Sequence, residues 1–342
     1  MLSLRRVIRT WLLEAWAILR TLKLRRIVNA AKLVLSYLYS LVTQRVVLRG
    51  SPMAFAIEPT SICNLHCPEC PTGTGLLKRP RGMMDLQDYR HALKQLAPRL
   101  MYLNLYVQGE PFMHPHIGQM IKEASCYALY TSTSTNGHYI TKENARQLVE
   151  GRLTRLIFSV DGASQESYEL YRIGGKLNRV KQSIIDVIRA RQAARTPYPI
   201  VVMQFLVFRH NEHELGAIKK LARTLRVDKL EIKTAQLNEF GTLQAPTNSR
   251  YSRYADTKEH IMKQATHNRC WRQWHAITLT WDGRLAPCCY DKDAEHSFGN
   301  LQHQTLHSLW FSPRSIAFKQ QVLNDRHKIT MCRNCPEGAH LF

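Results

Sequence analysis

Short apolar runs alternate with amphipathic segments between residues 53 and 235. The runs predict six strands: MAFAIEP (53–59), LMYLNLYVQGEP (100–111), ALYTSTSTNG (128–137), LTRLIFSVDG (153–162), PIVVMQFLVF (199–208) and KLEIKTA (229–235). The amphipathic segments predict helices near residues 86–97, 115–126, 141–150, 177–194, 211–225 and 252–265. Near-continuous apolar strands separated by helices indicate parallel βα units. Six units are fewer than a closed eight-stranded barrel contains, so we predict an α/β fold with a partial (β/α)6 TIM-like barrel; an open sheet is the alternative.

Residues 1–49 follow a different pattern, with two amphipathic helical stretches that are strongly basic. They hold ten Lys or Arg and one acid, Glu14, which is a net charge of +9 in a chain whose total is +22. The longest uncharged run, residues 33–44, would form a helix of about 18 Å, too short for a hydrocarbon core of roughly 30 Å. These helices could instead lie in the headgroup layer of an anionic membrane, or pack on the protein itself or on a second subunit.

Export and nucleic-acid binding fit the sequence less well. A signal peptide is disfavoured because Glu14 interrupts the apolar run and more basic residues follow it. We expect no nucleic-acid partner, since no known docking motif accompanies the positive charge. The nine cysteines lie mainly in two clusters, which suits metal-bound thiolates in a reducing cytoplasm better than a disulfide framework. We therefore expect a cytoplasmic protein, held at the inner face of the cytoplasmic membrane if its N-terminal helices bind lipid.

The first cysteine cluster lies in EPTSICNLHCPECPTG (58–73), directly after the first predicted strand. Cys63, Cys67 and Cys70 supply three thiols, whereas a structural zinc site needs a fourth ligand. A four-iron cluster held by three cysteines keeps one iron open for an external ligand. The position after the first strand places this loop at the mouth of the barrel.

The second cluster lies downstream of the predicted barrel and comprises Cys270, Cys288, Cys289, Cys332 and Cys335. HAITLTWDGRLAPCC (275–289) predicts a hairpin with Gly283 at its turn, and TMCRNCPEG brings the last two thiols. Four thiolates, from Cys270, Cys288, Cys332 and Cys335, would saturate a second iron–sulfur cluster, with a four-thiolate zinc site as the alternative. Cys289 is a spare thiol that could replace Cys288. We expect Cys126 to be a small core residue on a helix.

The spacing of the first cluster resembles that of the radical S-adenosylmethionine superfamily, and CNLHCPEC resembles the form in members with an extra C-terminal cluster. Glu69 stands where the family often has an aromatic residue. The second cluster resembles the shortened twitch form of the SPASM domain, which implies one auxiliary [4Fe-4S] cluster. The resemblance divides the chain into basic helices (1–50), a radical S-adenosylmethionine barrel (51–250) and an auxiliary cluster domain (251–342).

The same resemblance implies residues near S-adenosylmethionine. QGEP, with Gly109 and Glu110, resembles the segment whose backbone receives the amino group of the cofactor. STNG and SVDG resemble segments near the cofactor after the third and fourth strands, and YRIGG resembles a segment whose basic residue meets the cofactor carboxylate. The residues concerned are Asn136, Ser159, Asp161 and Arg172. Tyr106, Gln108, His114, Lys233 and Gln236 lie near strand ends where substrate could sit, although each is more often structural.

The resemblance implies an enzyme of oxidoreductase type that reductively cleaves S-adenosylmethionine to a 5′-deoxyadenosyl radical. This radical abstracts a substrate hydrogen, and an auxiliary cluster favours a net oxidation such as dehydrogenation or crosslinking. The basic helices favour a lipid-linked or membrane-held substrate, and a peptide or protein substrate is the alternative. A flavodoxin or ferredoxin would supply electrons. The rival from another class is a non-enzymatic iron–sulfur electron carrier or a zinc-stabilised binding module.

Overall fold

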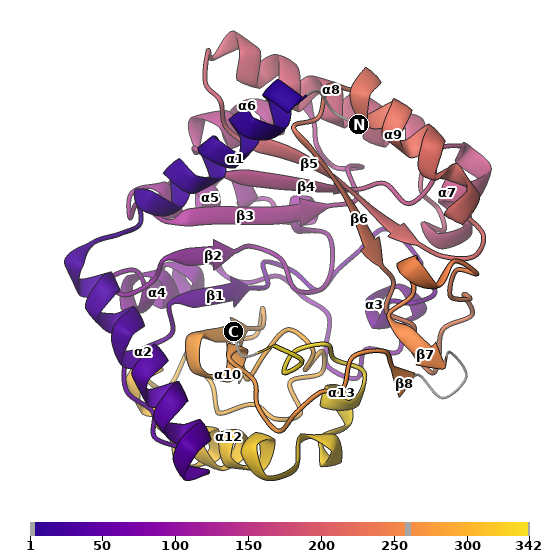
Figure 1. Ribbon diagram of the computed structural model, residues 1–342. Coiled ribbons are helices and arrows are strands. Elements are labelled where there is room, and N and C mark those ends of the chain that lie inside the picture. The colour runs from indigo at the N-terminus through magenta and orange to yellow at the C-terminus, as the bar shows by residue number, and fades with distance from the viewer. Residues whose placement is uncertain (1–3, 257–260, 341–342) are drawn as a thin grey trace.

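A curved, mostly parallel sheet of eight strands organises the protein (Figure 1). The computed structural model describes residues 4–256 and 261–340. The strands are β1 (Ala54–Ile57), β2 (Tyr102–Asn104), β3 (Tyr130–Thr135), β4 (Arg155–Ser159), β5 (Ile200–Val207), β6 (Lys229–Thr234), β7 (Tyr254–Asp256), β8 (Ile261–Met262), β9 (Ala276–Leu279) and β10 (Leu285–Ala286). The α-helices are α1 (Leu4–Leu19), α2 (Leu24–Thr43), α3 (Pro71–Thr74), α4 (Leu86–Leu96), α5 (Ile117–Ser125), α6 (Lys142–Glu150), α7 (Gln165–Tyr171), α8 (Leu177–Ala193), α9 (Leu215–Thr224), α10 (Arg272–His275), α11 (Leu306–Trp310), α12 (Pro313–Asp325) and α13 (Thr330–Arg333).

The six strands predicted from the apolar runs are confirmed as β1 to β6, adjacent and parallel in chain order. The predicted hairpin is confirmed as β9 and β10, which pair antiparallel around Gly283. This hairpin also extends the barrel sheet, because β9 pairs in parallel with β1. The sheet order runs from β10 through β9 and β1 to β6, so β10 and β6 form its two edges and the barrel is partial.

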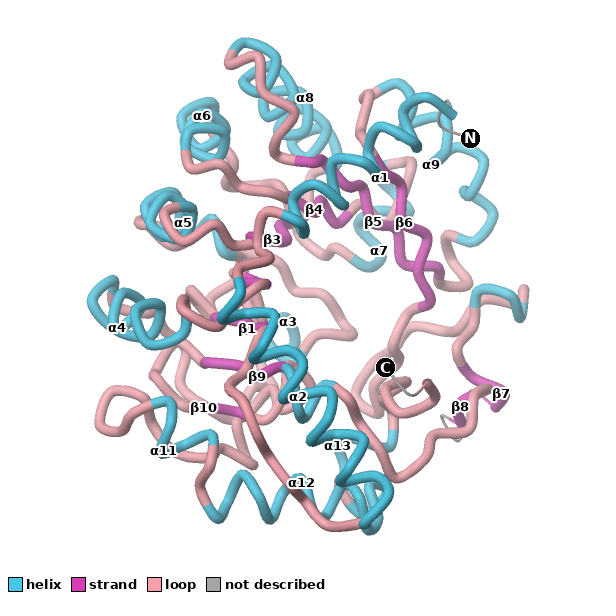
Figure 2. Tube along the Cα trace, turned by 60° about the vertical axis from the view of Figure 1, so that its left-hand side comes forward, coloured by secondary structure: helices cyan, strands magenta, loops and turns pink. Residues whose placement is uncertain are grey.

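Helices α4, α5, α6 and α8 stand in a row on the outer face of the sheet (Figure 2). Alternate strand residues such as Leu103, Leu156 and Met203 point to these helices and form the main apolar core with them. The alternation follows from the pleat, which sends successive side chains to opposite faces. The side chains that alternate with these residues therefore face the interior of the barrel.

The two N-terminal helices lie along the side of the molecule where the parallel strands begin (Figure 1). α1 crosses the amino ends of β4 to β6, where Glu14 pairs with Arg155 at 3.0 Å and Thr10 donates to the carbonyl of Asp228. α2 packs on the C-terminal part of the chain through Tyr37, whose ring contacts Trp274 at 5.0 Å. Among the described residues, no helix is both long and apolar enough to cross a bilayer.

The helix predicted over residues 252–265 is wrong. Its described parts form the short antiparallel strands β7 and β8, and residues 257–260 lie outside the described residues. The cause is a tertiary contact: the buried Tyr254 hydroxyl donates to Asn334 at 2.8 Å and accepts from the backbone N–H of Leu237 at 3.0 Å. These bonds tie the segment to two distant loops, which overrides a favourable local helix propensity.

Candidate active site

The three-cysteine loop leaves β1 at the carboxyl edge of the sheet and ends in α3. The loop is anchored at its start, where the Thr60 hydroxyl donates to the carbonyl of Gly82 at 2.9 Å. Its end is held close by Gly73, because a Cβ there would come within 2.6 Å of both backbone N and O of Cys67. The chain therefore folds back tightly on itself around Cys67.

The three thiols gather in one small cluster with apolar side chains, including Tyr171 and Phe208. Cys67 is buried, and Cys63 and Cys70 are half-buried. Burial raises the pKa of Cys63 to about 11 and also raises the pKa of Cys67. Ionisation of thiols in such a setting requires a compensating positive charge, which bound iron supplies.

Each of the three sulfurs meets a polar side chain from a different element: Gln108 from the loop after β2, Asn136 from the end of β3 and Arg172 from the end of α7. The Asn136 amide lies 3.8 Å from the sulfur of Cys63, and the Arg172 guanidinium lies 3.7 Å from that of Cys67. The Cys70 thiol lies 3.6 Å from the Gln108 side-chain oxygen. The N–H groups of Asn136 and Arg172 donate to the sulfurs of Cys63 and Cys67 and so stabilise negative charge on them, whereas the Gln108 oxygen accepts from the Cys70 thiol.

Gly109 and Glu110 shape the loop after β2 against the cysteine loop. Gly109 has a φ of +71°, and a Cβ there would collide with the carbonyl oxygens of Thr60 and Ile62. The Glu110 backbone N–H donates to the carbonyl of Ile62 at 2.8 Å. Only glycine allows this approach of two backbones.

The Glu110 carboxylate is fully occupied within the protein. It accepts from the backbone N–H groups of Phe112 (3.1 Å) and Asn136 (2.7 Å) and from the Thr135 hydroxyl (2.7 Å). Burial raises the pKa of this carboxyl to about 7, although these bonds oppose the change. Its side chain thus ties the segments after β2 and β3 together.

Asp161 and Arg172 form a buried pair beside Cys67. Two nitrogens of Arg172 lie 2.6 Å from one Asp161 oxygen, and the other oxygen accepts from the backbone N–H of Leu206 at 2.7 Å. The guanidinium also lies 4.6 Å from the Tyr171 ring. Ser159 is buried at the end of β4, opposite Gln204 of β5. Asp161 therefore holds Arg172 against the cysteine loop.

Glu69 is a site residue whose role the sequence did not reveal. Its buried carboxylate accepts from the backbone N–H groups of Asn238 (2.8 Å) and Leu243 (3.0 Å), and its carbonyl accepts from the Asn238 side chain. A side chain at Gly241 would collide with the same carboxylate. Glu69 thus binds the loop after β6 to the cysteine loop.

The second cysteine cluster is assembled from four separate places: Cys270 lies two residues before α10, Cys288 two residues after β10, Cys332 in α13 and Cys335 in the loop that follows α13. Cys270, Cys288 and Cys335 are buried and Cys332 is half-buried. Burial and then the charge of Cys335 raise the pKa of Cys270 to about 12, and Cys335 also acts on Cys288 and Cys332. The four thiols therefore lie within electrostatic reach of one another.

A buried arginine binds the backbone around this second cluster. The Arg326 guanidinium donates to the carbonyl of Arg269 at 3.2 Å and to those of Cys332 and Cys335, each at 3.4 Å. Its positive charge acts on Cys270, Cys332 and Cys335, where it opposes the rise in pKa that burial causes. Cys289 is half-buried and lies near Tyr106 of the barrel, since its charge acts on the pKa of that tyrosine.

The expectation of a buried Cys126 is wrong. Cys126 is exposed at the C-terminal end of α5, where its sulfur lies 3.8 Å from the carbonyl of Lys122. The helix ends at this residue and the chain turns outward, so the side chain has left the apolar stripe of α5. His114, in contrast, is buried and bonds to the carbonyl of Met84 at 2.8 Å, which is a structural role.

The inner face of the barrel carries a polar group of which sequence reasoning named only Lys233. The rings of Tyr102 and Tyr130 stack at 5.1 Å, and Arg155 pairs with Glu231, which also meets Lys233 at 3.3 Å. Although burial opposes it, the Arg155 charge helps to lower the pKa of Glu231 to about 2. The interior of a barrel that served only as packing would be filled with branched apolar residues.

The fold and the two cysteine clusters together define an iron–sulfur protein with a partial barrel and a separate C-terminal cluster domain. Residues 57–222 match the model of the radical SAM superfamily, and residues 270–336 match that of the SPASM iron–sulfur cluster-binding domain. The two matches together cover more than half of the chain. The protein is thus a member of the radical SAM superfamily with a SPASM-type cluster domain, and the family implies a [4Fe-4S] cluster with S-adenosylmethionine and auxiliary iron–sulfur binding.

Solved structures support the fold. SuiB from Streptococcus suis, bound to S-adenosylmethionine, aligns with a TM-score of 0.64 and 11% identity over 83% of this chain and 71% of its own. BtrN, in complex with AdoMet and 2-DOIA, aligns with a TM-score of 0.52 and 15% identity over 84% and 94%. anSMEcpe with bound AdoMet aligns with a TM-score of 0.59 and 15% identity over 83% of this chain and 84% of its own. The two segments that match the family models, 57–222 and 270–336, lie inside the predicted domains 51–250 and 251–342. The exact domain limits stay predictions.

Proposed function

We propose that Cys63, Cys67 and Cys70 hold the cluster that binds S-adenosylmethionine. The observation that supports this most is the convergence on these sulfurs of Gln108 from the loop after β2, Asn136 from the end of β3 and Arg172 from the end of α7. A four-iron cluster held by three thiolates leaves one iron open for an external ligand, whereas a structural zinc site is closed by four protein ligands.

When bound and reduced, this cluster supplies the electron that cleaves S-adenosylmethionine to methionine and a 5′-deoxyadenosyl radical. The protein's contribution is to position the cofactor. The backbone at Gly109 and Glu110 would receive the cofactor amino group, and Arg172, held by Asp161, would meet the cofactor carboxylate. Asn136 and Ser159 would border the rest of the cofactor from the ends of β3 and β4.

We assign a second [4Fe-4S] cluster to Cys270, Cys288, Cys332 and Cys335, and a net oxidation to the reaction. The substrate would lose one hydrogen atom to the 5′-deoxyadenosyl radical and then one proton and one electron. A cluster with four protein ligands has no iron free for substrate, so its contribution would be to accept that electron. A reduced flavodoxin or ferredoxin would provide the first electron.

The proposed substrate is a lipid-linked or otherwise membrane-held molecule, supported by the basic apolar N-terminal helices. A peptide or protein substrate is the second candidate, because SuiB has been crystallised with its precursor peptide SuiA and aligns with a TM-score of 0.63 in that form. Both candidates need polar contacts in the barrel, where Tyr102, Tyr130, Arg155 and Glu231 stand. A non-enzymatic electron carrier would not need side chains converging on an open cluster site.

The test begins with iron and sulfide analysis of anaerobically prepared protein, followed by reduction with S-adenosylmethionine and assay of 5′-deoxyadenosine. We expect about eight irons per chain. Cys67→Ala should abolish nucleoside formation, and Cys335→Ala should lose about four irons yet still form the nucleoside. Cys126→Ala, at an exposed thiol outside both clusters, is the matched control and should behave as wild type. Zinc in place of iron, or no nucleoside from intact clusters, would refute the enzyme.

The substrate class is tested separately with the same assay. Lipid extract and peptide extract from the source cells are added in parallel, and nucleoside formation is compared with the rate without substrate. A rise with the lipid extract, accompanied by a lipid species two hydrogens lighter, supports the lipid-linked class. A rise with the peptide extract alone moves the assignment to a peptide-modifying enzyme.

A further inference from the structure

α1 exposes most of its large apolar side chains. Its inward side carries polar contacts beside the apolar Leu13 and Ala17: Thr10 donates to the carbonyl of Asp228, Arg6 donates to the carbonyl of Val227, and Glu14 pairs with Arg155. The outward side is apolar and covers roughly half of the helix circumference at 3.6 residues per turn. Its members are Leu4, Val7, Ile8, Trp11, Leu12, Trp16, Ile18 and Leu19, each at least about half exposed.

α2 also exposes large apolar side chains, although Leu33 and Tyr37 are buried against the protein. Arg26 is buried and donates four bonds to the carbonyls of Thr21, Ala97, Tyr127 and Ala128. The outward stripe of α2 consists of Leu24, Ile27, Val28, Leu35, Tyr39 and Val42. We call this stripe and the outward apolar side of α1 together the N-terminal face. Most of the large exposed apolar side chains of the described chain lie on it, and such a patch indicates an interaction surface.

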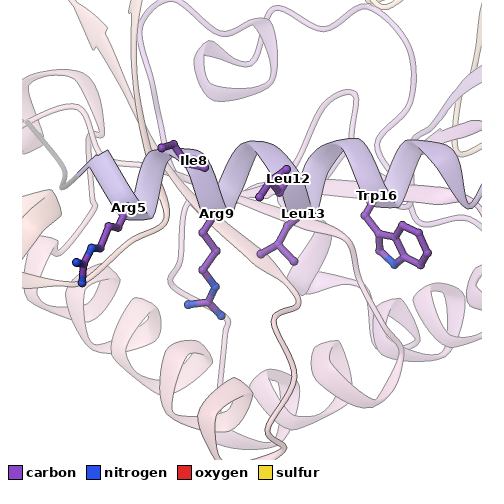
Figure 3. Close-up of a pocket in the computed structure, with 6 residues that line it drawn as sticks. All are labelled: Arg5, Ile8, Arg9, Leu12, Leu13 and Trp16. Carbon is purple, nitrogen blue, oxygen red and sulfur yellow. The ribbon is translucent and has the colours of Figure 1, made fainter.

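Charge distinguishes between possible occupants of the N-terminal face. Arginines adjoin its apolar residues, as Figure 3 shows for the hollow on α1 that is lined by Arg5, Ile8, Arg9, Leu12, Leu13 and Trp16. The one acid of residues 1–49, Glu14, is turned inward to Arg155. A second copy of the chain would therefore bring arginines against arginines. An anionic surface with an apolar layer beneath it complements both features.

The tryptophans fit the same occupant. Trp11 and Trp16 are 67% and 58% exposed, although tryptophan normally buries most of its surface. Trp side chains are enriched at membrane interfaces, where the ring lies at headgroup depth. Both lie on the outward side of α1, beside the arginines.

We propose that the N-terminal face docks on an anionic lipid bilayer, with the axes of α1 and α2 lying along its surface. This inference adds the binding surface to the proposed membrane-held substrate, but it does not depend on the radical chemistry. Binding is measured without S-adenosylmethionine, so a failure of docking and a failure of catalysis remain distinguishable.

The test is flotation of the full-length purified protein with vesicles of phosphatidylcholine alone or mixed with phosphatidylglycerol. We expect binding to the mixed vesicles, weaker binding at high salt, and little binding to phosphatidylcholine alone. Trp11→Gln with Trp16→Gln should lower the partition coefficient by about tenfold or more. Quenching by brominated lipids should fall in the same variant, because both exposed tryptophans have been removed.

Leu19→Gln and Leu170→Gln form a matched pair, since both leucines are 55% exposed and only Leu19 lies on the N-terminal face. Leu19→Gln should weaken vesicle binding several-fold, and Leu170→Gln should leave it unchanged. Equal binding by wild type and the tryptophan variant, or equal effects of the two leucine changes, would overturn the proposal. So would a concentration-dependent dimer that is lost in the tryptophan variant while vesicles are not bound, because the face would then join two copies.

Discussion

The contact between Glu69 and the loop after β6 allows a quantitative prediction for Glu69→Gln. The carboxylate accepts two backbone N–H bonds, from Asn238 and Leu243, with its two oxygens. A glutamine keeps one acceptor oxygen but points an NH2 group at the second N–H. The variant loses one charge-assisted bond in a site that is only 7% exposed, which costs about 1.5–3 kcal/mol. Local opening of residues 236–245 should become roughly 10- to 100-fold more frequent.

Hydrogen exchange followed by mass spectrometry measures this opening directly. Peptides that cover residues 236–245 should exchange faster by that factor in Glu69→Gln. Glu212→Gln is the matched control, because the Glu212 carboxylate accepts from the backbone N–H groups of Thr247 and Asn248, each at 3.1 Å. It should accelerate exchange at residues 247–248 and leave residues 236–245 unchanged. Unchanged exchange in Glu69→Gln, or the same change in both variants, would refute the assigned role of Glu69.

Two further changes test the packing of the cysteine loop and a buried cation. Gly109→Ala places a Cβ against the carbonyls of Thr60 and Ile62 at a φ of +71°, so it should prevent iron incorporation during reconstitution; normal iron content would contradict this. Burial lowers the pKa of Lys319 to about 7, below its value in the unfolded chain, so wild-type stability should rise as pH increases from about 7 to 10. Lys319→Met should raise the melting temperature at pH 7 and reduce that rise, and a lower melting temperature at pH 7 would exclude this account.

Much of the barrel could be predicted because its strands are apolar on the helix-covered side. Leu103, Leu156 and Met203 belong to runs that stand out locally, so neighbouring residues are enough to identify a strand. The addition of β9 to the edge of β1 was not predictable in this way. Ala54 and Ala276 are register partners although 222 positions separate them, and a hairpin motif alone does not show which sheet it joins.

The positions of the cysteines were predictable because ligand spacing is a local property of the sequence. The role of Glu69 was not, since it depends on the backbone of residues far along the chain. The polar barrel interior was missed for a related reason. Arg155, Glu231 and Tyr130 lie on three different strands, and only the curvature of the sheet brings them together.

The two ends of the barrel have different tasks if both proposals hold. α1 lies across the amino ends of β4 to β6, whereas the three-cysteine loop lies at the carboxyl end of β1, on the other side of the molecule (Figure 1). A bilayer bound to the N-terminal face therefore lies at the amino end of the barrel, and the cysteine loop lies at the carboxyl end. A lipid-linked substrate must then extend its reacting group past α1 into the polar interior, or around the open edge between β6 and β10. The Glu14 to Arg155 contact lies on the first of these routes, because it joins α1 to the interior arginine. Glu14→Gln should accelerate turnover of a membrane-held substrate if entry passes under α1 and leave it unchanged if entry uses the open edge, while the rate without substrate stays the same.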